Sequence, residues 1–359
     1  MSKIKILHTS DIHLREYNDD RWQTLKSLLI IAKKESVDLF TISGDLFNAD
    51  INAEYLRHSL RELFSNNGFK IVIIPGNHDI NSYGTKESGL YFGSDVSIIY
   101  NLNEPIEYEK VRIWGYPFEA IREKAFLERI DSIKDNLTPD KCNILLYHGE
   151  LLDAFFSRNE FGEEGDERYM PSKLSFFKDL NFNYILAGHF HSRFEVWKPN
   201  EQSFFVYPGS PISITRRERG IRKVNLLEVG NPPLEYSLNT PHFEEVIVEF
   251  DPFTEKDVLK VINEKIKEKH PNARIELTVK GYINSLGMGK TETEIVEEIE
   301  KLVKNKNIEL DYQIEDINEI LEDELFLKFL KYLNRGDYNN EKMEQMRNLV
   351  IKAMRRLNS

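Results

Sequence analysis

Short hydrophobic segments that end abruptly in polar residues recur through the first two thirds of the chain. Each is rich in Ile, Leu or Val and is followed at once by Asp, His, Asn or Gly. The segments are 4–8, 39–42, 71–74, 144–147 and 184–187. Short and nearly continuous apolar runs predict β-strands in a sheet that is covered on both faces.

Segments with helical periodicity lie between the first three of these strands. In 22–36 and 53–66, apolar residues recur at spacings of three and four,. Strands that alternate with helices predict an α/β fold, in which ligands bind at the carboxyl ends of the strands. We therefore expect the five polar clusters to meet at one edge of one sheet, or of two sheets packed together.

The pattern of apolar and polar residues changes near residue 240, in a stretch that contains the prolines of 232–233 and 241. Beyond this point the patterns predict strands at 244–250 and 273–279, and helices at 255–269 and 291–304,. The last stretch, 316–359, is charged and helical, with apolar stripes in 325–333 and 343–357. We predict three domains: 1–240, a small α+β domain at 241–312, and C-terminal helices at 313–359.

The polar clusters contain the side chains that bind hard or borderline metal ions. They are Asp11-x-His13, Gly44-Asp45, Gly76-Asn77-His78-Asp79, His148 and His189-x-His191. Carboxylate and amide oxygens suit hard divalent cations, and imidazole suits manganese, iron and zinc. An aspartate can bridge two ions that lie about 3.5–4 Å apart. The set therefore predicts a site for Mn²⁺ or a similar ion.

Each cluster taken alone has an ordinary explanation. Gly-Asp and Gly-Asn-His-Asp are common turn sequences, and a lone histidine after a strand, such as His148, is more often a core or surface residue. The metal-site interpretation depends on the joint occurrence of five clusters, each directly after a hydrophobic strand.

Composition and charge exclude several other classes of protein. No apolar run approaches the roughly 20 residues of a membrane span, and the N-terminus lacks a secretory signal pattern, so we expect a cytoplasmic protein without a membrane partner. The single cysteine, Cys142, excludes an internal disulfide and a thiolate metal site,. A net charge of −12 argues against coating nucleic acid by bulk electrostatics, although local basic patches can still hold phosphates,.

Taken together, the clusters resemble the signature of the calcineurin-like metallophosphoesterases over about residues 6–192. The resemblance implies a four-layer αββα core and two metal ions. One ion would be held by Asp11, His13, Asp45 and His191, and the other by Asp45, Asn77, His148 and His189. It also implies that His78 protonates the leaving oxygen. Asp79 lies next to His78 in the sequence, and it either orients His78 for catalysis or stabilises the turn.

Three further features resemble the SbcD-type DNA nucleases within this superfamily. They are the opening 7–14, the Tyr-Pro-Gly-Ser-Pro turn at 207–211, and the layout of a small α+β domain followed by helices. This resemblance implies a Mn²⁺-dependent DNA nuclease that acts in double-strand-break repair, with a DNA-capping domain at 241–312. It also implies a homodimer whose C-terminal helices bind an SbcC-like SMC-type ATPase.

One departure concerns Asn48, which stands where these nucleases often carry a histidine that helps to seat the DNA. We therefore expect phosphodiester cleavage, with weaker 3′–5′ exonuclease action. The candidate DNA contacts are Arg15, Asn48, Arg193, Arg216, Arg217 and Arg219. A solvated hairpin is the alternative interpretation of 216–223.

Two other functions compete with a DNA nuclease. A phosphoesterase for small nucleotides or phosphoproteins would need neither the residues beyond 240 nor the apolar stripes. A non-catalytic scaffold would be expected to have lost ligands, whereas every ligand position and His78 are intact.

Overall fold

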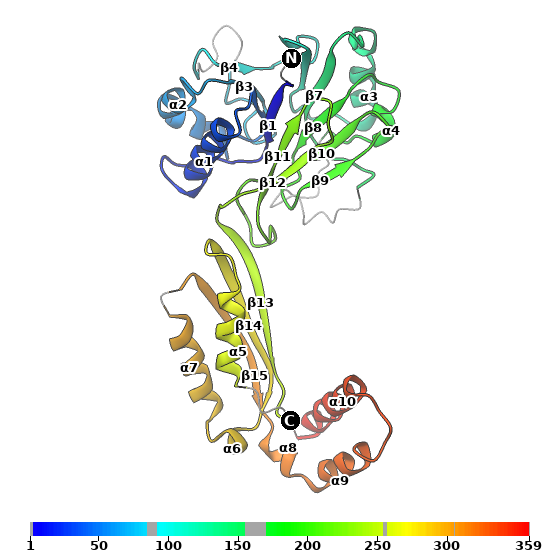
Figure 1. Cartoon of the computed structure of the whole chain (residues 1–359). Helices are drawn as coiled ribbons and strands as arrows, with labels where there is room; N and C mark the ends of the chain where they lie inside the picture. The colour runs from blue at the N-terminus through cyan, green and yellow to red at the C-terminus, as the bar shows by residue number, and fades with distance from the viewer. Residues whose placement is uncertain (1–2, 85–91, 155–169, 254–256, 305, 359) are drawn as a thin grey trace. The chain divides into compact units, whose positions relative to one another are not determined.

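The computed structural model describes residues 3–84, 92–154, 170–253, 257–304 and 306–358. The chain forms two compact units, Met1–Phe243 and Glu244–Ser359 (Figure 1). Each unit has hydrophobic clusters of its own.

The first unit contains two six-stranded sheets. The order in one sheet is β12 (Leu234–Ser237), β11 (Lys223–Glu228), β1 (Lys5–Thr9), β2 (Leu39–Ser43), β3 (Lys70–Ile74) and β4 (Val96–Ile98). The order in the other is β5 (Ile106–Tyr108), β6 (Val111–Tyr116), β7 (Cys142–His148), β8 (Tyr184–Gly188), β10 (Phe204–Tyr207) and β9 (Glu195–Trp197). The five strands predicted from the apolar segments are confirmed as β1, β2, β3, β7 and β8.

The strands that precede the polar clusters are parallel neighbours. In the first sheet β1 pairs with β2 and β2 with β3, and in the second sheet β7 pairs with β8. Parallel neighbours end at the same edge of a sheet. The register places His148 at the end of β7 opposite Gly188 at the end of β8. The polar clusters of each sheet are therefore brought to one edge.

Hydrophobic side chains pack in three clusters that separate four layers. Between the sheets lies a cluster that includes Ile6, Val72, Ile144 and Leu186. The outer face of the first sheet packs on α1 (Asp20–Lys34) and α2 (Asp50–Phe64), and that of the second on α3 (Glu123–Asp131) and α4 (Leu174–Phe177) (Figure 1). The predicted αββα core is thereby confirmed.

The two predicted helices of this unit form, but each begins earlier than apolar spacing indicates. The α1 helix starts at Asp20 because the side chain of Asp19 accepts a hydrogen bond of 2.8 Å from the backbone N–H of Trp22,. The helix is followed by Ser36 in the left-handed conformation (φ 53°). Polar capping residues therefore set the ends of the helix, whereas periodicity locates only its buried face.

The second unit has a three-stranded sheet in the order β13 (His242–Phe250), β14 (Ala273–Ile283) and β15 (Ile308–Asp316). Helices α5 (Val258–Lys267) and α7 (Glu292–Val303) contribute to its hydrophobic cluster. The expected helix at 255–269 is shorter than predicted, because Asp257 caps α5; residues 255 and 256 lie outside the described residues. Strand β15 was not predicted.

The second unit also contains the helices α6 (Ser285–Met288), α8 (Asn318–Glu322), α9 (Glu324–Leu333) and α10 (Asn340–Asn358). Phe326 of α9 and Ile351 of α10 are buried together with Ile317 and Ile320. An ion pair between Arg355 and Glu315 connects α10 to β15. Within the described residues, no helix is both long and apolar enough to cross a membrane.

Candidate metal centre

The structure brings the predicted metal ligands together at the carboxyl ends of five strands. Six of the seven are buried with at most 3% of their surface exposed, and Asn77 is half-buried. They come from the segments after β1, β2 and β3 in the first sheet and at or after the ends of β7 and β8 in the second: Asp11, His13, Asp45, Asn77, His148, His189 and His191.

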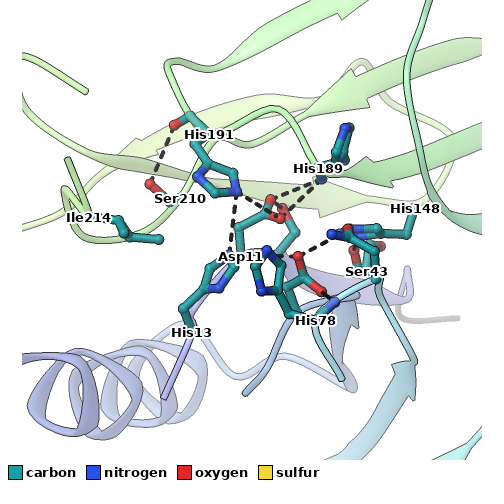
Figure 2. A network of polar contacts seen from close by, with 12 residues as sticks. Asp11, His13, Ser43, His78, His148, His189, His191, Ser210 and Ile214 are labelled. Atoms are coloured by element: carbon teal, nitrogen blue, oxygen red, sulfur yellow. Dashed lines mark hydrogen bonds and ion pairs between the residues drawn. The ribbon is translucent and has the colours of Figure 1, made fainter. Parts of the chain in front are cut away.

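One group of ligands is closely packed. Asp11, His13, Asp45 and His191 each offer one ligand atom, and these atoms lie within 4.8 Å of one another. The Nε2 atom of His191 is 3.5 Å from Asp11 Oδ1 and 3.4 Å from His13 Nε2. Figure 2 shows the side chains of Asp11, His13 and His191 pointing toward one another. This spacing is suited to a single ion held between them.

A second group adjoins the first through Asp45. His148 Nε2 lies 2.9 Å from Asn77 Oδ1 and 3.3 Å from Asp45 Oδ2. The ring of His189 is next to that of His148, with 5.4 Å between the centroids. The backbone N–H of His189 donates to both carboxylate oxygens of Asp11 at 3.1 Å. Asp45 is thus the residue common to both groups.

The surroundings of the Asp45 Oδ2 atom indicate that a cation fits between the two ligand groups. This oxygen is fully buried and accepts no hydrogen bond from the described residues. It is approached by two imidazole nitrogens, at 3.6 Å from His13 and 3.3 Å from His148. A buried carboxylate oxygen that no well-formed hydrogen bond satisfies is costly, and a bound cation would compensate it. The donor set of Asp, His and Asn suits divalent ions such as Mn²⁺.

Four of the ligands have unusual backbone conformations. Asp11, His13, Asp45 and His189 have φ values of 55°, 50°, 52° and 97°. Non-glycine residues in such conformations cost about 1–3 kcal/mol each and persist where the surroundings impose them. Here the segments after β1 and β2 hold each other, since His13 N donates to Asp45 O at 2.9 Å and Asp11 N to Gly44 O at 3.1 Å.

Two glycines of the sequence clusters are required by close approach. A Cβ atom on Gly44 would lie 2.0 Å from His148 Nδ1, and one on Gly76 would lie 2.1 Å from Asp45 Oδ1. Gly44 also has a φ of 88°, which favours glycine,. The Gly-Asp and Gly-Asn sequences therefore reflect the crowding of backbone against ligand side chains.

Burial and neighbouring charges shift the pKa values of several side chains in the candidate metal centre. Burial alone would raise the pKa of Asp11, but the neighbouring His191 and His148 lower that pKa to about 2. Burial would likewise lower the pKa of His148, but Asp45 beside it raises the pKa to about 10. The pKa of His13 falls to about 3 because the side chain is buried. Binding of a cation must therefore displace protons from the imidazoles that the carboxylates hold charged.

The orientation of His148 is fixed by the neighbouring strand. Its Nδ1 lies 2.8 Å from the backbone oxygen of Ser43, which accepts the ring N–H. The Nε2 atom is therefore left to face Asp45 and Asn77. Ser43 Oγ donates to Leu186 O at 2.7 Å and so links the two sheets directly beneath the centre.

His78 and Asp79 differ in their surroundings. His78 is half-buried and its ring lies edge-on to that of His13, with 4.8 Å between the centroids. Asp79 is buried and accepts hydrogen bonds from Gly76 N at 2.7 Å, Phe47 N at 3.1 Å and Tyr83 Oη at 2.8 Å. Burial raises the pKa of Asp79 to about 7. These contacts favour the turn-stabilising alternative for Asp79, and the catalytic assignment of both residues stays a prediction.

The candidate DNA contacts lie outside the ligand groups. Five are exposed arginines: Arg15, Arg193, Arg216, Arg217 and Arg219. Arg193 donates to Glu195 at 2.5 Å. Asn48 is half-buried and accepts a hydrogen bond of 3.0 Å from Arg21, which also donates to His13 O at 2.5 Å. Arg21 was not anticipated from the sequence.

Two charged residues in 216–223 were misjudged as part of an exposed basic segment. Arg222 is 2% exposed and Glu218 is 1% exposed. Glu218 Oε1 lies 3.4 Å from His191 Nδ1, on the side of the ring that faces away from Asp11. The signal that could have identified Glu218 is a single acidic residue within a run of arginines.

The chain matches the family model described as calcineurin-like phosphoesterase over residues 4–193, more than half of its 359 residues, and it therefore belongs to this family of hydrolases. The resemblance inferred from the motifs is confirmed. Together with the buried Asp and His cluster, family membership implies a divalent metal site.

Relatives among characterised proteins carry the name DNA double-strand break repair protein Mre11. The protein from Sulfurisphaera tokodaii is 29% identical over 265 residues, which cover 69% of this chain and 64% of that protein. The protein from Saccharolobus solfataricus is 25% identical, over 60% of this chain and 56% of the relative. In both cases the alignment spans less than two thirds of the relative.

Solved structures give weaker similarities. A dimetal phosphatase from Danio rerio has a TM-score of 0.43 at 9% identity, covering 63% of this chain and 92% of that one. The nuclease MPE from Pseudomonas putida has a TM-score of 0.29 at 15% identity, covering 62% of this chain and 84% of that one.

Proposed function

We propose that this protein is a Mn²⁺-dependent DNA nuclease that hydrolyses phosphodiester bonds at broken DNA ends. The observation that carries the hydrolytic part is Asp45, whose fully buried Oδ2 faces imidazoles of both ligand groups. The choice of DNA as substrate is supported by the Mre11 relatives.

The ligands are assigned to two ions that share Asp45. Asp11, His13 and His191 complete one group, and Asn77, His148 and His189 complete the other. When bound, divalent ions supply Lewis-acid chemistry that polarises the phosphodiester and activates water.

His78 is assigned as the general acid of this reaction. It is only half-buried, and its ring adjoins that of His13 at the edge of the ligand group. An imidazole ordinarily titrates near neutral pH and can donate a proton to the leaving oxygen. The exposed arginines at 15, 193, 216, 217 and 219 are assigned to the phosphates that flank the scissile bond,.

Asn48 affects the expected balance between endonuclease and 3′–5′ exonuclease activity. Its amide oxygen accepts from Arg21, so the side chain is already engaged beside His13. An amide cannot donate a proton as an acid, and we therefore propose endonuclease cleavage with weak 3′–5′ exonuclease action.

The second unit is proposed to serve the substrate and a partner. Residues 241–312 would cap DNA, and the helices of 313–359 would dock on the coiled coil of an SbcC-like SMC-type ATPase, with the nuclease acting as a homodimer. Exposed apolar side chains support the docking: Leu325 and Leu327 of α9 are 69% and 45% exposed, and Leu349 of α10 is 69% exposed. Such residues are typical of helices that bind a partner.

The test compares cleavage of end-labelled single- and double-stranded DNA with Mn²⁺ by the wild type, His78→Ala and His58→Ala. His58 is an exposed histidine of α2 and serves as the matched control. Loss of a general acid is expected to slow cleavage by about 10²–10⁴-fold at unchanged metal content, while His58→Ala cleaves like the wild type.

Hydrolysis of a small phosphodiester without cleavage of either DNA would refute the proposed substrate. That result would favour a phosphoesterase for small nucleotides or phosphoproteins. Equal cleavage by His78→Ala and the wild type would refute the role of His78.

A further inference from the structure

His191 lies between two carboxylates on opposite sides of its ring. Its Nε2 atom is 3.5 Å from Asp11 Oδ1, within the ligand group, and its Nδ1 atom is 3.4 Å from Glu218 Oε1. All three side chains are at most 3% exposed. Each ring nitrogen of His191 therefore faces a buried carboxylate oxygen.

Glu218 is held in place by donors from its own turn. Its Oε2 accepts hydrogen bonds of 2.8 Å from Ser210 Oγ and from Ile214 N. Its Oε1, the oxygen that faces His191, accepts from Thr215 N at 3.3 Å and from Thr215 Oγ1 at 3.2 Å. Figure 2 shows Ser210 and Ile214 to the left of His191, on the side away from His78. The carboxylate therefore has a fixed position before any cation binds.

Arg222 fixes the main chain of the same ligand. Its buried guanidinium donates to His191 O, to Ser192 O at 2.8 Å and to Ser210 O at 3.0 Å. The backbone N–H of Ser210 donates to His191 O as well, at 3.0 Å. Both the ring and the backbone of His191 are thus supported by the segment that ends in Arg222.

One of the two histidines in the other ligand group, His148, is supported differently. His148 Nδ1 faces the neutral backbone oxygen of Ser43 at 2.8 Å, where His191 Nδ1 faces a carboxylate. A carboxylate partner fixes the tautomer of a ligating histidine and increases its basicity more than a carbonyl does. His191 and His148 are therefore unequal in the strength of their outer support.

We propose that Glu218 is a positioning residue for His191: it accepts the Nδ1–H, leaves Nε2 for the cation, and thereby strengthens the group of Asp11, His13, Asp45 and His191 over its neighbour. Arg222 assists by holding the backbone of His191. The inference rests on the metal centre proposed above, but it does not depend on DNA being the substrate.

The test is a Mn²⁺ titration of the metal-free 359-residue chain, in which binding is monitored by calorimetry and by the electron paramagnetic resonance signal of free Mn²⁺. Glu218→Gln removes the charge at nearly constant volume and is expected to weaken one of two binding events by about 10–100-fold, leaving the other unchanged. Glu195→Gln is the matched control, because it removes a nearby negative charge that is paired with Arg193. It should bind Mn²⁺ like the wild type.

If Glu218 only stabilised its turn, Thr215→Val would weaken Mn²⁺ binding as Glu218→Gln does. The proposal predicts a different result. Thr215→Val removes one donor to Glu218 but keeps the carboxylate beside His191, so it should perturb the turn and leave Mn²⁺ affinity within about twofold of the wild type. Affinity of Glu218→Gln equal to that of Glu195→Gln would overturn the proposal.

A second measurement does not require Glu218→Gln to fold. In the wild-type chain loaded with diamagnetic Zn²⁺, the nitrogen resonances of His191, assigned by their loss in His191→Gln, should show a proton on Nδ1. A proton on Nε2 would overturn the proposal. Failure of the proposed nuclease function looks different, because the wild type would then bind Mn²⁺ as described here without cleaving DNA.

Discussion

At the scale of single residues, Asp45 connects the two ligand groups. Its Oδ1 accepts from the backbone N–H of His78 at 3.0 Å, and its Oδ2 faces the imidazoles of His13 and His148. Its own backbone is in the left-handed region, with φ 52°. A single side chain therefore contacts the segment that carries the proposed general acid and is shared by the two ligand groups.

Gly44 and Gly68 allow a matched test of the crowding around this residue. Both have positive φ values, 88° and 86°, but a Cβ on Gly44 would meet His148 at 2.0 Å, whereas one on Gly68 meets nothing within 4 Å. We expect Gly68→Ala to cost about 1 kcal/mol from backbone strain alone, and Gly44→Ala to cost about 3 kcal/mol or more because the clash is added. Urea unfolding of the metal-free variants measures both; equal costs would contradict the close approach.

The proposed ligands could be selected from the sequence because each follows a hydrophobic strand, and the order of parallel strands brings such residues to one edge. The sequence did not identify Glu218, because position 218 lies in an arginine-rich stretch that resembles an exposed loop. What buries Glu218 is its long-range approach to His191, 27 positions back along the chain, and local pattern does not contain that information.

At the scale of elements, the sequence located buried faces better than boundaries. Helices α1 and α2 were predicted from the spacing of apolar residues, but both begin earlier than that spacing indicates. Strand β15 was missed although Ile308, Leu310 and Ile314 alternate along it, because the intervening residues are mostly acidic and half of the strand is exposed. Its pairing with β14 is a tertiary contact between distant segments.

The start of α1 offers a test at this scale. Asp19→Ala removes the side chain that accepts the N–H of Trp22, and we expect a loss of about 0.5–2 kcal/mol in the free energy of unfolding,. Asp19→Asn keeps an acceptor at the same position and should stay within a few tenths of a kcal/mol of the wild type. Denaturant unfolding of the two variants provides the comparison, and equal losses would show that the cap is not what begins the helix.

At the scale of the whole molecule, the metal centre lies entirely within one of two units. Met1–Phe243 contains every proposed ligand, while Glu244–Ser359 has its own hydrophobic clusters. A ligand that binds only the folded state stabilises the unit that holds it. The two units should therefore respond differently when metal is added or removed.

We expect Mn²⁺ at 100 times its Kd to stabilise the first unit by about 2.7 kcal/mol. Hydrogen exchange followed by mass spectrometry should show slower exchange in β1, β2, β7 and β8, with β14 and β15 unchanged. Chelation should reverse the effect, and Asp45→Asn should abolish it. Equal protection of β14 and β15 would contradict the independence of the two units toward metal.

The order of the strands suggests that bound metal would help to hold the two sheets together. All strands of the second sheet, β5 to β10, form one continuous stretch of chain between β4 and β11 of the first. In topology the second sheet is an insertion. The polypeptide enters it after β4 and leaves it before β11, and the proposed ligands come from both sheets. Ions bound there would cross-link the two sheets at one edge. A force that separates the sheets would therefore have to break the metal–ligand bonds at that edge as well as the apolar contacts between the sheets.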